Sequence, residues 1–316
     1  MIKIYTLKDK VNFSSEQIIL FGLLKNYNSL SIESHNFNFK GESRYKNVIE
    51  TCKKLFNYVD DIKECNVIVF PYKFKGFKDN NFKVLFSLSQ NFKKPLYLFF
   101  NDDYDKPLLP FNEYIKIYRT SFYRSCKLDN EYSLPAFSPD YFYNNYLQNP
   151  KLSIGYCGHK IHGRDRYLNL FLNSNIETNF ILRNGFWAPG IDKLQARKEY
   201  IKNIDENIFT FCYRGAGNFS YRFYDVMMMG RIPILIKTDS VYPFEDKYDL
   251  NSIGIVLEES DIKNHNLDLI KIIKIFYKNN KERLLDIQKQ NRIIWEKYYS
   301  CYGFIQNMQN IMITTK

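Results

Sequence analysis

The stretch from residue 209 to residue 239 constrains the fold most, because it combines a strand, a glycine loop, a helix and a second strand in direct succession. The run Ile208–Cys212 is apolar, aromatic and β-branched, which is typical of a strand buried on both faces of a parallel sheet. Gly215 and Gly217 then form a turn, where glycine allows positive φ and lets the backbone approach a ligand closely. A helical pattern follows, and Pro233 opens a second buried strand. This succession predicts one unit of a parallel α/β sheet.

The junction between the glycine loop and the following helix predicts an anion site. Ser220 stands at the expected helix cap, and the N–H groups of the first helical turn point toward the loop together with the positive end of the helix dipole. We expect Arg214 and Arg222, on either side of the junction, to donate charge-assisted hydrogen bonds to a diphosphate. A tight turn with two solvated arginines is the alternative interpretation.

The order of motifs in this stretch resembles the sugar-donor half of exostosin-like glycosyltransferases. Residues 211–246 read FCYRGAGNFSYRFYDVMMMGRIPILIKTDSVYPFED, with a Phe-Cys strand, an Arg-Gly loop, Ser-x-Arg, Gly-x-x-Pro and a hydrophobic strand that ends in Asp. Tyr213 and Arg214 stand where many members of that family carry proline. Weaker similarity extends to CNVIVFPYKF at 65–74 and to IGYCGHKIHGRDRY at 154–167.

The resemblance implies two Rossmann-like domains facing a cleft, the GT-B type of glycosyltransferase fold. It implies an inverting, metal-independent transferase whose donor is a nucleotide sugar, with a UDP-sugar as the first expectation, and whose acceptor is a glycan or a lipid-linked sugar in surface polysaccharide or glycoconjugate synthesis. The donor is a substrate, so no separate cofactor is expected. In this interpretation Arg214, Ser220 and Arg222 hold the donor diphosphate and neutralise its charge as the bond to the sugar breaks.

Apolar strands and helices alternate along the whole chain, as in parallel sheets. Its 316 residues suffice for two domains of roughly 150 residues each. We expect an acceptor-side domain over residues 1–147, a donor domain over 148–295 and a carboxyl-terminal helix over 296–316 that packs back on the first domain. The strands expected in the first half are Ile2–Tyr5, Leu30–Glu33, Val67–Pro71, Pro95–Phe100 and Ile115–Tyr118, and the helices are Ser15–Asn26, Tyr45–Phe56 and Phe82–Gln90.

Three further residues of the second half are candidates for the donor site, because ligands of open parallel sheets bind beyond the carboxyl ends of the strands. Glu259 follows the strand 254–257 and precedes a helix that Ser260 and Asp261 are expected to cap, and its spacing resembles the family's Glu-x-Asp-Ile ending. Asp239 ends the strand after Pro233. Arg166 follows the strand that ends near residue 157, and the family-like register favours it over Arg164. Solvated loop or helix-end positions are the alternatives for each.

A base must deprotonate the acceptor hydroxyl in an inverting transfer. Asp102 and Asp103 follow the strand 95–100 in an Asn-Asp-Asp turn, and the family carries a polar, often acidic, element after a comparable strand. Turn chemistry alone also explains this pattern. His35 and Lys73, beyond two other strands, are lesser candidates.

The formal net charge of +11 comes from 45 Lys and Arg residues against 34 Asp and Glu residues, spread along the chain without an arginine-rich block. Solvated surface lysines are the commonest interpretation of such a spread, and the functional interpretation is peripheral attraction to an anionic membrane that carries the acceptor. No nucleic-acid motif is evident. The six cysteines form no C-x-x-C pair, and the four histidines lack metal-ligand spacing, so we expect reduced thiols and no metal site.

The amino terminus lacks an apolar signal segment, and the apolar runs fall short of the roughly 20 residues that span a bilayer. We therefore expect a cytoplasmic protein, with peripheral contact at the inner membrane face. Two other functions stay open. The first is a fucosyltransferase-like enzyme that uses a guanine nucleotide sugar, and the second is a non-catalytic binder of anionic glycan or nucleic acid.

Overall fold

The computed structural model describes residues 1–11, 15–23, 42–45, 47–76, 78–108, 110–186 and 188–314. The chain forms two compact units, each assembled from separate segments of the sequence. Unit 1 comprises Met1–Asp140, Ser240–Phe244 and Glu296–Lys316, and unit 2 comprises Tyr141–Asp239 and Glu245–Trp295.

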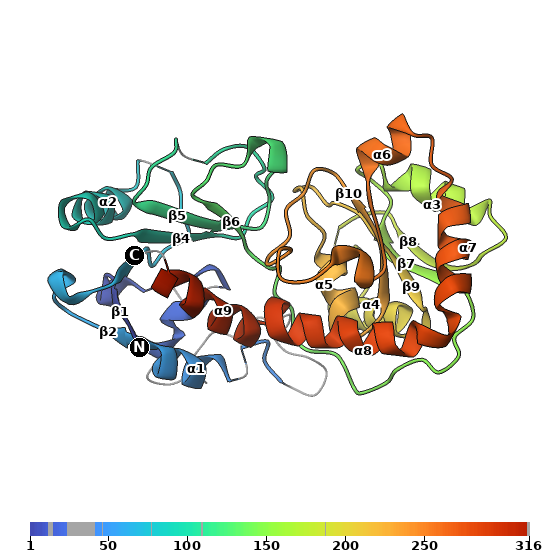
Figure 1. Cartoon of the computed structure of the whole chain (residues 1–316), viewed down its shortest axis with the longest axis horizontal. Coiled ribbons are helices and arrows are strands. Elements are labelled where there is room, and N and C mark those ends of the chain that lie inside the picture. Colours follow the sequence, from blue (N-terminus) through green and yellow to red (C-terminus); the bar gives the residue numbers. More distant parts are fainter. Residues whose placement is uncertain are drawn as a thin grey trace. The chain divides into compact units, whose positions relative to one another are not determined.

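Unit 1 contains a six-stranded sheet in which every described pair is parallel, in the order β2-β1-β3-β4-β5-β6. Its strands are β1 (Ile2–Tyr5), β2 (Phe56–Tyr58), β3 (Val67–Val69), β4 (Leu96–Phe100), β5 (Ile115–Arg119) and β6 (Glu131–Ser133). Its α-helices are α1 (Val48–Leu55), α2 (Asn80–Phe92) and α9 (Cys301–Thr314). The red α9 lies beside the blue α1 in Figure 1, and Phe304, Ile305 and Met308 of α9 belong to the same buried core as strands β1 and β4.

Unit 2 contains a five-stranded parallel sheet in the order β11-β10-β9-β7-β8 (Figure 1). Its strands are β7 (Ser153–His159), β8 (Glu177–Arg183), β9 (Phe209–Cys212), β10 (Ile232–Lys237) and β11 (Ile255–Glu258). Its helices are α3 (Arg164–Leu172), α4 (Lys193–Glu206), α5 (Tyr221–Met228), α6 (Glu259–Asn264), α7 (Leu269–Asn280) and α8 (Leu284–Ile294).

Burial explains why the central strands form. Every residue of β4, β9 and β10 is buried, as expected for parallel strands covered by helices on both faces. Several helices begin at an aspartate whose carboxylate accepts a backbone N–H of the first turn. Asp79 caps α2 in this way and Asp192 caps α4.

The α/β class with two parallel Rossmann-like sheets is confirmed by these topologies. The expected strands appear within a few residues of their predicted bounds, except Leu30–Glu33, which lies outside the described residues together with His35. Strands β2 and β6 are additions that the apolar pattern did not indicate.

Three helix predictions were wrong in detail. The segment Ser15–Leu23 is a 3₁₀ helix with a kink at Gln17 rather than an α-helix. The helix predicted over Tyr45–Phe56 ends at Leu55, because Phe56 pairs with Ile2 in the sheet. The helix predicted to begin after a Ser260–Asp261 cap begins at Glu259 instead.

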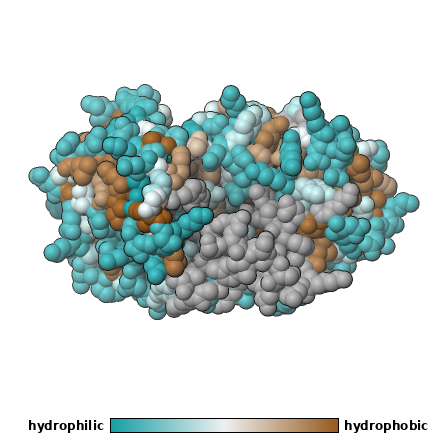
Figure 2. All heavy atoms as spheres, turned by 180° about the vertical axis from the view of Figure 1, so that it is seen from behind, coloured by the Kyte–Doolittle hydropathy of each residue, from teal (hydrophilic) through white to brown (hydrophobic). Residues whose placement is uncertain are grey.

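Hydrophilic side chains dominate the described face in Figure 2, with separate hydrophobic patches between them. The exposed large apolar side chains are likewise scattered over many elements, among them Val84, Leu172 and Ile293. In the part of the chain that the structure describes, no helix is both long and apolar enough to cross a membrane.

Candidate functional site

The strand order of unit 2 reverses between β7 and β9. The chain runs from β7 to β8 on one side and then returns to β9 on the other side of β7. In open parallel sheets the crevice at the carboxyl ends of the strands beside such a reversal is the preferred place for a ligand. The loop after β7 and the glycine loop after β9 both emerge at this point.

The loop after β9 is closed by its own backbone. The Gly215 N–H donates to the Phe219 carbonyl at 2.9 Å, and Arg214 Nη2 donates to the Ala216 carbonyl at 3.1 Å. Residues 217–220 are buried. Ser220 stands at the N-cap of α5 with β-region dihedrals, but its side chain accepts no capping hydrogen bond, which corrects the expected cap.

The conformational role expected for the two glycines was wrong. Neither Gly215 nor Gly217 is among the described glycines with positive φ. Near this point, positive φ occurs instead at Gly158, near the end of strand β7 with φ +154°, and at Gly163, in the loop after β7 with φ +82°. A Cβ on Gly158 would lie 2.8 Å from Arg222 Nη2, whereas a Cβ on Gly215 would meet its nearest neighbour at 3.7 Å. The close approach that requires glycine therefore occurs at Gly158.

Arg222, in the first turn of α5, points back toward the end of β7. Its side chain is only 8% exposed, and Nη2 donates to the Cys157 carbonyl at 2.7 Å. The guanidinium carbon lies 4.1 Å from the centre of the Tyr156 ring and 5.8 Å from that of Tyr200. Burial opposes its charge, but the neighbouring phenols and thiols outweigh burial and raise the pKa of Arg222.

Arg222 also carries a buried Nε that has no hydrogen-bond partner among the described residues. No described carboxylate pairs with its guanidinium, whose recorded acceptor is the Cys157 carbonyl. A carbonyl oxygen satisfies a donor without cancelling its charge, and a buried charge without a counter-ion is costly. This arrangement is suited to an anion that supplies the missing negative charge.

Arg164, the first residue of α3, joins the two loops. Its Nε and Nη2 donate to the Arg214 carbonyl at 3.1 and 2.8 Å, and its Nη1 donates to the His159 carbonyl at 3.1 Å. Burial lowers the pKa of Arg164, and the charge of nearby Arg222 contributes to the same shift. Like Arg222, Arg164 has no carboxylate partner in the described parts of the chain. Two arginine side chains thus bring uncompensated positive charge to the reversal point.

Arg166 has a different partner. It forms an ion pair with Glu259, and its Nη2 lies 3.0 Å from the Tyr167 hydroxyl. Glu259 Oε1 also accepts the Tyr213 hydroxyl at 2.6 Å, and Oε2 lies 2.9 Å from Lys263 Nζ. The structure therefore brings together two residues that sequence reasoning named separately, and it ties Glu259 to the residue directly before Arg214.

Asp239 ends the turn after β10 with φ +59°, and its backbone N–H donates to Glu258 Oε2 at 3.3 Å. The other Glu258 oxygen pairs with the buried Lys237 at 2.7 Å. Asp225, within α5, accepts the Tyr200 hydroxyl at 2.7 Å, which gives it a structural role beneath Arg222.

The candidate base residues lie at the carboxyl edge of the sheet in unit 1. Asp102 Oδ2 pairs with Lys73 Nζ at 3.0 Å, and Oδ1 accepts the Tyr104 N–H at 3.0 Å. Burial alone would raise the pKa of Asp102, but the hydrogen bonds and the charge from Lys73 outweigh it and lower that pKa. Asp103 is exposed, and its carbonyl accepts the Ser121 hydroxyl at 3.2 Å.

Several residues of these arrangements were not predicted from the sequence. Tyr156 and Tyr200 flank Arg222, and they lie on β7 and α4, far from it in the chain. In unit 1 the buried Arg119 pairs with the buried Glu131 at 2.7 Å and donates to the Tyr104 carbonyl at 2.7 Å. A charged residue at the end of an otherwise largely apolar strand, as Arg119 is at the end of β5, was the signal available in the sequence.

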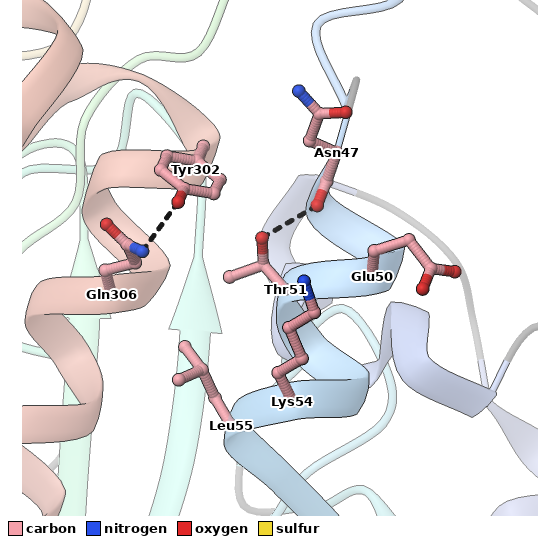
Figure 3. Close-up of a pocket in the computed structure, with 7 residues that line it drawn as sticks. All are labelled: Asn47, Glu50, Thr51, Lys54, Leu55, Tyr302 and Gln306. Atoms are coloured by element: carbon pink, nitrogen blue, oxygen red, sulfur yellow. Dashed lines mark hydrogen bonds between the residues drawn. The ribbon is translucent and has the colours of Figure 1, made fainter.

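A separate pocket of about 300 Å³ lies between α1 and α9 in unit 1, distant in sequence from all of these loops. Figure 3 shows Tyr302 and Gln306 of α9 on one side and residues of α1 on the other. Its lining residues are Asn47, Glu50, Thr51, Lys54, Leu55, Tyr302 and Gln306. None of the residues predicted for the donor or the base lines it.

Comparison with known proteins finds a family match in the second half of the chain. Residues 182–274 match the model of the Exostosin GT47 domain. Exostosin-1 of Drosophila melanogaster is 26% identical over 119 residues, which cover 38% of this chain and 14% of that protein. The Exostosin-1 homolog of Caenorhabditis elegans is 24% identical over 102 residues, 32% of this chain and 25% of the relative. A probable glucuronosyltransferase of Oryza sativa subsp. japonica is 30% identical over 63 residues, 20% of this chain and 14% of the relative. The matches thus span a small part of each relative's length.

Solved structures of glycosyltransferases show distant overall likeness. HepE of Anabaena, crystallised with UDP and glucose, has a TM-score of 0.44 at 8% identity, with 99% of this chain and 100% of that chain covered. TarM of S. aureus has a TM-score of 0.41 at 12% identity, with 78% and 55% covered. An α1,3-fucosyltransferase has a TM-score of 0.38 at 13% identity, with 97% and 89% covered.

The family match begins in β8 and ends in α7, so it includes the loop after β9, all of α5, β10 and Glu259. The resemblance inferred from the motif order at 211–246 is therefore confirmed: residues 182–274 of this chain match the Exostosin GT47 domain.

Proposed function

We propose that this protein is a glycosyltransferase that moves a sugar from a nucleotide-diphosphate donor to a glycan or lipid-linked acceptor, in the synthesis of a surface polysaccharide or glycoconjugate. One observation carries the proposal. The buried guanidinium of Arg222 has no carboxylate partner among the described residues and lies at the strand reversal of unit 2, inside the stretch that matches the Exostosin GT47 domain. A diphosphate would supply the missing negative charge.

In this proposal Arg214, Ser220 and Arg222, with the amino terminus of α5, hold the donor diphosphate. Gly215 and Gly217 keep the loop free of side chains where the ligand lies. Negative charge grows on the diphosphate as the bond to the sugar breaks, and fixed donors aimed at it stabilise the transition state. The nucleoside lies toward Arg166, Asp239 and Glu259. A UDP-sugar is the first donor to test, on the strength of the resemblance.

The transfer is proposed to be inverting and metal-independent, with a carboxylate of the Asn-Asp-Asp turn as the base. Asp102 is already engaged by Lys73, and its lowered pKa makes it a weaker base than an ordinary aspartate. Asp103 has its side chain in solvent and is the better candidate of the two. We expect Asp103→Asn to lower turnover with little change in donor affinity, and Asp102→Asn to have a smaller effect on turnover.

The proposal places the protein in the cytoplasm, in peripheral contact with an anionic membrane that carries the acceptor. The net charge of +11 supports such an attraction, which a rise in salt would weaken. Binding to vesicles with and without anionic lipid, measured at low and high salt, tests this part alone.

The decisive experiment combines a ligand screen with one variant. Thermal shift with UDP, GDP and CDP identifies the preferred nucleobase, and hydrolysis of the matching nucleotide sugars identifies the donor. We expect one nucleoside diphosphate to raise the melting temperature of the unaltered protein and to have much less effect on Arg222→Lys, which keeps the charge but loses the planar fork.

Three outcomes would change the proposal. Selective binding of GDP with hydrolysis of a guanine nucleotide sugar would favour a fucosyltransferase-like enzyme. Binding of polyanions that depends on salt alone, with no response to any nucleoside diphosphate, would favour a non-catalytic binder. Equal nucleotide binding by the unaltered protein and Arg222→Lys would remove Arg222 from the site.

A further inference from the structure

Two arginines of α3, separated by one residue, contact different parts of unit 2. Arg164 donates to backbone carbonyls of the loops after β7 and β9, whereas Arg166 pairs with Glu259. They also differ in exposure, because Arg164 is partly buried and Arg166 is exposed. The family-like register favoured Arg166 over Arg164 for the donor site, so the contacts of Arg164 need their own explanation.

The bonds of Arg164 fix one peptide plane of the glycine loop. Its Nε and Nη2 both donate to the Arg214 carbonyl, a forked contact that only a planar guanidinium makes. The Arg214 carbonyl and the Gly215 N–H belong to the same planar peptide and point in opposite directions. The Gly215 N–H donates to the Phe219 carbonyl at 2.9 Å and closes the loop just before Ser220. Arg164 thereby holds the plane on which loop closure depends.

The same guanidinium holds the other loop. Its Nη1 donates to the His159 carbonyl, which also accepts the Tyr156 hydroxyl at 2.6 Å. The Tyr156 ring lies under the Arg222 guanidinium, whose Nη2 holds the Cys157 carbonyl. Carbonyls at the end of β7 thus accept hydrogen bonds from Arg164 of α3 and from Arg222 of α5. A displacement of Arg164 would disturb both sides of the anion site.

We propose that Arg164 is the positioning residue that sets the diphosphate-binding loop against the end of β7, while Arg166 and Glu259 act on the nucleoside side of the site. The inference rests on the proposed function, since it assigns the diphosphate to that loop. It predicts that the two arginines affect nucleotide binding differently. Loss of the Arg164 fork weakens recognition of the second phosphate, and loss of the Arg166 guanidinium does not.

The test compares Arg164→Lys with Arg166→Lys. Both substitutions are on the same helix, and both keep the positive charge but remove the planar guanidinium. Isothermal titration with UDP and UMP, or with GDP and GMP if guanine is the preferred base, gives the preference for diphosphate over monophosphate. We expect this preference to fall by about tenfold or more in Arg164→Lys, as for a lost hydrogen bond to a charged group, and to stay unchanged in Arg166→Lys. Equal preferences in the two variants, or a loss confined to Arg166→Lys, would overturn the inference.

A second measurement separates this inference from the proposed function. Hydrogen exchange at the Gly215 amide, in the absence of ligand, reports directly on loop closure. We expect faster exchange in Arg164→Lys than in Arg166→Lys, with melting temperatures of both variants close to that of the unaltered protein. If no nucleoside diphosphate binds the unaltered protein, the proposed function fails, and unchanged Gly215 exchange in Arg164→Lys would then reject the positioning role as well.

Discussion

Cationic side chains at the carboxyl edges of the two sheets are held in two different ways. In unit 2, Arg164 and Arg222 donate to backbone carbonyls, whereas Arg166 and Lys237 pair with Glu259 and Glu258. In unit 1, Arg119 pairs with Glu131 and Lys73 pairs with Asp102. Both sheets are parallel and both edges carry polar loops, so topology does not distinguish them. The difference lies in the counter-ion, because Arg164 and Arg222 have no carboxylate partner among the described residues, whereas Lys73 and Arg119 each have one.

A carboxylate cancels the charge of a cation, whereas a carbonyl only orients it. Cations of the first kind contribute to the folded state and have little left to offer a ligand. Cations of the second kind are costly until an anion arrives, and stability exchanged for binding is typical of functional sites. Unit 2 also contains the first kind, since the buried Arg231 pairs with Asp205 at 2.7 Å away from the loops. The contrast therefore belongs to Arg164 and Arg222 rather than to the unit.

The largest effect should come from breaking the neutralised pair in unit 1. Arg119→Met leaves the Glu131 carboxylate buried without its partner, and we expect the free energy of unfolding to fall by about 3–5 kcal/mol. Urea denaturation measures it. The double variant Arg119→Met/Glu131→Leu should recover a large part of the loss. A loss below about 1 kcal/mol in the single variant would show that the Arg119–Glu131 pair does not stabilise the fold in the way this comparison assumes.

Arg222→Met should behave in the opposite manner. Removing a buried charge that lacks a carboxylate offsets the lost bond to Cys157, so we expect the free energy of unfolding to change by less than about 1 kcal/mol. Affinity for the preferred nucleoside diphosphate should fall by about 1.5–3 kcal/mol or more, measured by titration calorimetry. A variant that unfolds as readily as Arg119→Met, yet still binds nucleotide, would reverse the comparison.

A pair of glycine substitutions tests which loop carries the constraint. Gly158→Ala places a methyl group 2.8 Å from Arg222 Nη2 at φ +154°, and we expect about 1–3 kcal/mol of destabilisation together with weaker nucleotide binding. Gly215→Ala meets nothing closer than 3.7 Å, so stability should change by about 0.5 kcal/mol or less. Unfolding and binding curves of the two variants suffice. If Gly215→Ala alone abolishes binding, the ligand approaches that loop more closely than the free protein indicates.

The smallest effect concerns Asp102. Its pKa is lowered in the folded state, so the ion pair with Lys73 stabilises the protein above the ordinary aspartate pKa of about 3.9 and is lost as the pH falls through the lowered value. The pair is partly exposed, which limits it to about 0.2–1 kcal/mol. We expect Asp102→Asn to be slightly less stable at pH 7, and this difference to be smaller at an acid pH below the ordinary aspartate pKa. Urea denaturation at both pH values checks the sign, and a difference that grows in acid would contradict it.

The sequence predicted the elements that depend on local pattern. Strands such as β4 and β10 are continuous apolar runs, and a parallel sheet buries them on both faces. Strand β2 was missed because its three residues, Phe-Asn-Tyr, form a strand only through pairing with β1. Such pairing joins residues more than fifty positions apart and leaves no trace in a short window.

For the residues proposed to form the donor site, the sequence predicted their order along the chain and only part of their contacts. The glycine loop, the cap position of Ser220 and the nearby arginines follow from local order. The direction of the Arg222 side chain does not, because it depends on Tyr156 and Cys157 of another strand. The pairing of Arg166 with Glu259 likewise depends on how α3 and α6 meet in three dimensions. Local spacing shows which residues are available, and long-range packing decides what each one contacts.

The segmented make-up of unit 1 has a consequence for synthesis of the chain. The side chains of Phe304, Ile305 and Met308 complete the core around β1 and α1, yet they are translated after all of unit 2. A ribosome therefore releases the whole second sheet before the first can close its interior. Until those residues are made, the amino-terminal half exposes the apolar surface that they later cover, and exposed apolar surface of this kind favours aggregation.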